Sequence, residues 1–168
     1  MILKNFLKTL PGLAQCPDPD LEKIAQAMRV ESFAAGHTLI YEGKSNAEMY
    51  LILEGSVRAC HYGADGNSHE LKILRGGEFF GLLSLYDSQP ATASCIALEA
   101  VRVASLPYLA YQTLIRTAAP IGHYFQLAVA HQLARDLHER SAALRTSLKR
   151  QIAVNGFPSP ALGDPNTD

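Results

Sequence analysis

The spacing of hydrophobic residues changes twice along the chain, which predicts three structural regions. In residues 1–32 apolar side chains recur three and four positions apart, so that Ile2, Phe6 and Leu10 share one face. This spacing predicts N-terminal amphipathic helices, and Asp20 is the expected cap of the second one.

Residues 33–106 have a different pattern, in which short runs rich in Tyr, Leu, Ile and Val alternate with glycine turns. Turns spaced about 8 to 12 residues apart are typical of an all-β sandwich or barrel. The sequence ADGN at 64–67 predicts a tight hairpin. Residues 78–90 lack alternation and are expected to form a short helix and a loop, an insertion of the kind that carries function.

Residues 107–152 return to helical spacing, and a heptad pattern of small and apolar residues runs along their second part. We expect this seam to pair with a second copy of the chain; the alternative is a helix folded back on its own barrel. The seam consists of Leu127, Ala130, Ala134, Leu137, Ser141, Leu144 and Leu148. Residues 153–168 are rich in Pro, Gly and polar residues and predict a flexible tail.

Composition narrows the class of protein. The 168 residues are 48% hydrophobic and 18% charged, which excludes a disordered chain, and no long apolar run predicts a membrane span. The net charge of -1 gives no basic field that would attract nucleic acid or an anionic membrane. Three widely spaced cysteines predict reduced thiols and a cytoplasmic location.

An ordered series of motifs accompanies these regions. It comprises Phe33, Gly36 and Ile40 with Glu42-Gly43, the run from Met49 to Val57, Gly77 with Phe80-Gly81, and Pro90. Over about residues 10–150 the chain resembles the cyclic-nucleotide-binding domain of the bacterial catabolite-activator and fumarate-nitrate regulator family. The resemblance implies an α+β fold, a β jelly roll flanked by N-terminal helices and a long C-terminal dimerisation helix. It also implies a sensory or regulatory role without catalysis.

The phosphate-binding cassette of that family, here residues 80–94, departs from its pattern at two positions. The family has a Glu that binds the ribose hydroxyl and an Arg that binds the phosphate; this chain has Leu82 and Ala91 there. Losing the partner of a buried charge costs about 3–5 kcal/mol. We therefore expect that cyclic AMP is not bound in the usual way.

The ligand-binding residues implied by the resemblance are Gly81, Leu82, Leu83, Ser84, Ala91, Thr92 and Ala93. An apolar pocket would suit a hydrophobic effector, a haem or no ligand, and no cofactor is required. Arg58, Lys72 and Arg75 are weighed as replacements for the missing cation, although a surface position is expected for them. Haem would need one of the histidines, each of which is weak as an axial ligand: His37, His61, His69, His123, His131 and His138.

Two other functions stay open. The chain could be the sensory part of a transcription regulator, because too few residues follow the long helix for a DNA-binding domain; we expect no direct DNA binding and an unknown effector protein as partner. Less favoured is a cupin-type metal protein using His61, His69 and Glu70. An iron–sulfur cluster is disfavoured because Cys16 is the lone N-terminal cysteine. Since no nucleophile with a base and no nucleotide-binding loop is found, an enzyme is not expected.

Overall fold

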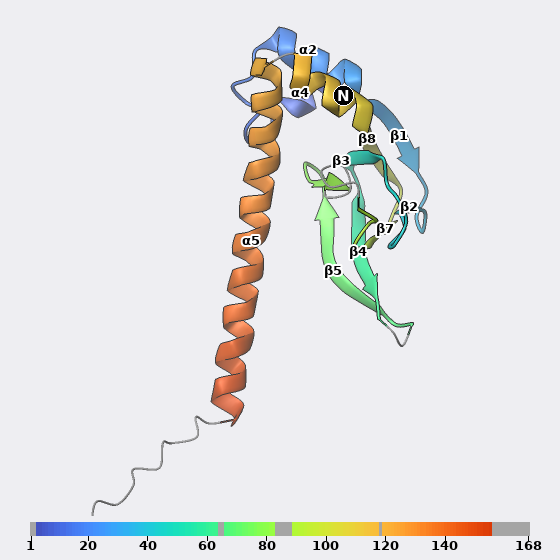
Figure 1. Cartoon of the computed structure of the whole chain (residues 1–168). Helices are drawn as coiled ribbons and strands as arrows, with labels where there is room; N and C mark the ends of the chain where they lie inside the picture. Colours follow the sequence, from blue (N-terminus) through green and yellow to red (C-terminus); the bar gives the residue numbers. More distant parts are fainter. Residues whose placement is uncertain (1–2, 64–65, 83–88, 118, 156–168) are drawn as a thin grey trace, which may run out of the picture. The chain divides into compact units, whose positions relative to one another are not determined.

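The computed structural model describes residues 3–63, 66–82, 89–117 and 119–155 (Figure 1). The chain divides into two compact units, Met1–Gln132 and Leu133–Asp168. All described strands and the shorter helices belong to the first unit, and the described part of the second is helical. The predicted α+β fold with a jelly roll is confirmed. Among the described residues, no helix combines the length and the apolar character that crossing a membrane requires.

Two antiparallel four-stranded sheets form the jelly roll. Sheet A has the order β1 (Arg29–Phe33), β8 (Val101–Pro107), β3 (Glu48–Glu54) and β6 (Phe79–Phe80). Sheet B has the order β2 (Thr38–Ile40), β7 (Ser94–Ala97), β4 (Ser56–Tyr62) and β5 (Ser68–Arg75). The first strand begins at Arg29 rather than at residue 33, because Arg29 already pairs with Ser105 of β8.

Strands that follow each other in sequence mostly lie in different sheets. The exception is the predicted hairpin: β4 and β5 pair along their whole length (Figure 1). Between β3 and β4 the chain crosses from sheet A to sheet B at Gly55, which has φ +85. A Cβ there would lie 2.7 Å from the carbonyl oxygen of Ala100, so the crossing depends on glycine.

Alternation along β3 and β8 divides the apolar residues between two cores. The core between the sheets, called here the inner core, takes one face of both strands. It contains Ile40, Tyr50, Ile52, Val57, Leu74, Phe80, Ala91, Cys95, Ala97, Val101 and Val103. The core between sheet A and the helices, called the outer core, takes the other face and includes Met49, Leu51, Phe79, Ala104 and Leu106.

The N-terminal helices α1 (Leu3–Leu7) and α2 (Asp18–Ala27) supply further residues of the outer core. The prediction of Asp20 as the cap of the second helix is wrong, because Pro17 occupies the cap position. Proline is favourable in the first helical turn, where its missing N–H needs no partner, so Pro19 allows the helix to begin at Asp18.

Two helices follow the last strand, α4 (Tyr108–Thr117) and α5 (Ala119–Asn155). The first turns of α5 bury one stripe in the first unit, formed by Ile121, Phe125, Ala128 and Gln132. Gly12 contacts this stripe closely, since a Cβ on Gly12 would lie 2.5 Å from the backbone nitrogen of Ala128. The start of α5 is therefore packed as part of the outer core.

Candidate functional site

The cassette begins where β6 ends, at Gly81. This residue has φ +78, and a Cβ on it would lie 2.8 Å from the carbonyl oxygen of Glu48 and 2.9 Å from Nδ2 of Asn46. Asn46 is itself fixed, because its Nδ2 donates a hydrogen bond of 2.6 Å to the same carbonyl. Sequence and structure agree that this position needs glycine.

Leu82, which replaces the ribose-binding Glu, packs against the outer core. Its side chain thus joins the helical side of sheet A rather than the inner core between the sheets. The expected site residues Leu83 and Ser84, and the short helix and loop predicted around them, lie outside the described residues.

Ala91, which replaces the phosphate-binding Arg, belongs to the inner core and is 7% exposed. Its N–H donates to the carbonyl of Lys44 at 2.9 Å, and its carbonyl accepts from the N–H of Gly43 at 2.8 Å. The backbone is therefore fixed on both sides, and a methyl group stands where the resemblance implies a guanidinium. Thr92 is exposed and Ala93 is half-buried.

The surroundings of Ala91 favour uncharged groups. Tyr50 and Phe80 stack with ring centroids 5.0 Å apart. Burial, aided by the Glu48 carboxylate, raises the pKa of Tyr50 to about 12, and burial raises the pKa of the Cys95 thiol to about 12. An anion entering this region would need a cation beside it, because its charge would lose hydration without compensation.

One lysine does lie on this side of sheet B. Val57 pairs with Leu74 and Ala97, all three of which are in the inner core. Two positions further along β4, Ala59 pairs with Lys72 on β5 and with Cys95 on β7. Because side chains two positions apart share a face, Lys72 lies on the inner face in a row with Ala59 and Cys95. The expected surface position of Lys72 is wrong; its side chain is 20% exposed.

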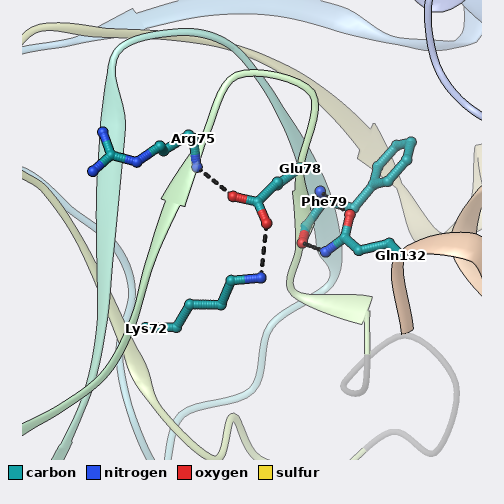
Figure 2. A network of polar contacts seen from close by, with 5 residues as sticks. All are labelled: Lys72, Arg75, Glu78, Phe79 and Gln132. Atoms are coloured by element: carbon teal, nitrogen blue, oxygen red, sulfur yellow. Dashed lines mark hydrogen bonds and ion pairs between the residues drawn. The ribbon is translucent and has the colours of Figure 1, made fainter. Parts of the chain in front are cut away.

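Lys72 forms an ion pair with Glu78, shown in Figure 2. Its Nζ lies 2.7 Å from Oε1 of Glu78, whose side chain is 13% exposed. The other carboxylate oxygen, Oε2, accepts a hydrogen bond of 2.7 Å from the backbone N–H of Arg75, while the Arg75 side chain points away (Figure 2). Arg75 is exposed, as expected, and Arg58 is half-buried.

Gln132 of α5 binds the backbone of the residue that follows Glu78 (Figure 2). Its Oε1 accepts from the N–H of Phe79 at 2.6 Å, and its Nε2 donates to the carbonyl of Phe79 at 2.7 Å. Since β6 is the edge strand of sheet A, the amide of Gln132 pairs with it as a neighbouring strand would. The start of α5 is thereby bonded to the strand that leads into the cassette.

The histidines do not gather into a metal site of three or more ligands in the described part of the chain. Nδ1 of His61 lies 2.5 Å from Oε1 of Glu42, and Oε2 of Glu42 accepts from the N–H of Tyr62 at 2.9 Å. His69 stands opposite His61 on β5. No group of three or more His, Cys, Asp or Glu residues suited to a metal occurs there, so the ligand set proposed for a cupin is not assembled.

Sequence reasoning missed the roles of Glu78 and Gln132. Gln132 had a signal, because it continues the buried stripe four positions after Ala128 and seven after Phe125. The sequence carries no signal for the role of Glu78, because its partner Lys72 can be assigned to the inner face only from the pairing of β5 with β4.

Comparison with known proteins finds relatives that contain a cyclic nucleotide-binding domain or are named for their response to cyclic AMP. The family model of the cyclic nucleotide-binding domain matches residues 30–118, more than half of the chain. A cAMP-dependent protein kinase regulatory subunit of Pyricularia oryzae is 32% identical over 118 residues, which are 70% of this chain and 30% of that protein. A CRP-like cAMP-activated global transcriptional regulator of Mycobacterium tuberculosis is 25% identical over 143 residues, 84% of this chain and 64% of the regulator.

Among solved structures, a cyclic nucleotide-binding domain from Methylobacillus flagellatus superimposes with a TM-score of 0.78 at 18% identity, covering 87% of this chain and 82% of that one, and supports the fold. The chain spans about a third of the kinase regulatory subunit and less than two thirds of the transcription regulator. The chain belongs to the cyclic nucleotide-binding domain family.

Proposed function

We propose that this chain is a homodimeric sensory or regulatory module, without catalytic activity, whose barrel does not hold cyclic AMP through the usual arginine. One observation carries the proposal: Ala91 lies in the inner core with its backbone bonded on both sides, and its methyl side chain cannot pair with a phosphate. Leu82 removes the second polar contact, because it packs into the outer core.

The energetic consequence is large enough to change which ligands bind. An unpaired buried charge costs about 3–5 kcal/mol, and an unpaired hydroxyl costs about 1–3 kcal/mol. Together these amount to several orders of magnitude in affinity, since about 1.4 kcal/mol is tenfold. Binding of cyclic AMP at a micromolar dissociation constant would weaken to millimolar or be lost.

Dimerisation is supported by the two faces of α5. The stripe that ends at Gln132 packs within the first unit, whereas the heptad seam lies on the opposite side of the helix. Large apolar side chains of the seam are exposed; Leu137 is 66% exposed and Leu144 is 61% exposed. A regular apolar seam with exposed leucines fits a second copy of the same helix.

Signalling would pass from the cassette to α5 and on to a separate effector protein. The amide of Gln132 bonds to β6 two residues before Gly81, so a ligand that shifts the cassette acts on a strand to which the helix is bonded. Such a signal requires a ligand that binds two arrangements of the domain with different affinity.

Calorimetry with cyclic AMP and cyclic GMP tests the proposal. We expect the natural sequence to bind either nucleotide with a dissociation constant of about 1 mM or weaker. The substitution Ala91→Arg restores the missing cation and should strengthen cyclic AMP binding by about tenfold or more. A dissociation constant tighter than about 10 µM for the natural sequence would refute the proposal.

A further inference from the structure

We infer that Lys72 is the cation that binds the anionic group of this domain's ligand, and that Glu78 occupies Lys72 when no ligand is bound. The inference rests on the proposed function, because it assumes that the barrel senses a small molecule. It moves the point of charge recognition from the cassette to strand β5, at the edge of sheet B.

The position of Lys72 supports this role. Ala91 and Cys95 share the inner core, Cys95 pairs with Ala59, and Ala59 pairs with Lys72. Lys72 therefore lies on the face of sheet B that borders the inner core, to which Ala91 also belongs. Burying a charged side chain on the inner face of a barrel costs free energy unless the charge is paired.

The ion pair with Glu78 is suited to exchange. Lysine is a compact charge on a flexible stem and makes no fixed two-point contact, so an incoming anion can take the place of one carboxylate oxygen. Glu78 is not left without a donor by this exchange, because its Oε2 also accepts from the N–H of Arg75. Opening the pair therefore costs less than it would for a carboxylate whose every donor is lysine.

The chemistry around Lys72 defines the ligand class. Its neighbours in the row are Ala59 and Cys95, and the stacked rings of Tyr50 and Phe80 belong to the same core. These surfaces suit a small organic anion with a compact charge, a phosphate ester or a carboxylate, attached to an apolar body. A phosphate ester and a carboxylate would both pair with the ammonium group of Lys72, and calorimetry with one probe of each kind distinguishes them.

Replacement of Glu78 by the ligand at Lys72 would also affect the contact between β6 and α5. Glu78 directly precedes Phe79, whose backbone N–H and carbonyl are both bonded to Gln132. Releasing Glu78 from Lys72 changes the constraint on the residue next to this bond. Binding at β5 and the position of β6 against α5 are thereby linked through one peptide unit.

Calorimetry with the full chain tests the inference, with cyclic AMP as the phosphate probe and octanoate as the carboxylate probe, each at concentrations up to about 10 mM. Lys72→Gln should weaken binding of at least one probe by about tenfold or more, and Lys72→Arg should retain it. Glu78→Gln should strengthen it, because it removes the competing carboxylate while keeping an acceptor for the N–H of Arg75. Lys149→Gln and Glu70→Gln are controls that change the same charges at exposed positions.

The outcomes separate this inference from the proposed function. The inference is overturned if neither probe binds, or if Lys72→Gln binds every probe as the natural sequence does. If either result is obtained while the Ala91→Arg protein gains cyclic AMP binding, the proposed function stands and the role of Lys72 fails. Urea unfolding of each variant, compared with the natural sequence, shows whether a loss of binding reflects a loss of folding.

Discussion

Gly81 shows how strongly a single residue constrains the start of the cassette. Gly36 has a similar backbone angle, φ +82, but nothing lies within 4 Å of a Cβ built on it. Gly36→Ala should cost about 1 kcal/mol, the strain of a side chain at positive φ. Gly81→Ala should cost about 1–3 kcal/mol more, because its Cβ would also press on the carbonyl of Glu48. Urea unfolding of the two variants measures the difference; equal costs would show that the contact at Gly81 is easily relieved.

At the residue scale the sequence identified the altered cassette positions but not where their side chains go. Leu82 and Ala91 lie in different cores, which the identity of these residues does not indicate. Lys72 was expected at the surface, together with Arg58 and Arg75. Only the pairing of Leu74 with Val57 decides which face of β5 is inward, and that pairing is between strands.

At the element scale the bond between α5 and β6 should contribute substantially to stability. Gln132→Ala leaves the buried N–H and carbonyl of Phe79 without this partner, and each unsatisfied group costs about 1–3 kcal/mol. We expect a loss of about 2–4 kcal/mol in the free energy of unfolding and faster amide exchange at Phe79. The control is Gln126→Ala, an exposed glutamine on the same helix, which should change stability by less than about 0.5 kcal/mol. A similar small effect at Gln132 would contradict the assigned bond.

Turn spacing predicted the strands well, because each glycine turn ends a short apolar run. The assignment of strands to sheets was not predictable in the same way, since β3 and β4 are neighbours in sequence yet lie in different sheets. Sheet membership depends on contacts between distant segments, such as β1 with β8. The hairpin of β4 and β5 was predictable because its signal is local.

At the scale of the whole molecule, the exposed seam of α5 should determine the oligomeric state. Replacing Leu137 and Leu144 with Glu places like charges opposite each other in a paired helix, so we expect a monomer where the natural chain is a dimer. Thr146→Glu adds a charge outside the seam and should leave the dimer intact. Light scattering coupled to size-exclusion chromatography measures the mass; a monomeric natural chain would contradict the proposed pairing.

The pairing of Gln132 with Phe79 has a consequence for aggregation. An edge strand with free N–H and carbonyl groups can recruit a strand from another molecule, and proteins avoid this by keeping such strands short or covered. β6 is two residues long, and the amide of Gln132 occupies the backbone groups of one of them. The side chain that fixes the helix therefore also caps this edge of sheet A, so its loss would favour intermolecular β-pairing as well as local unfolding.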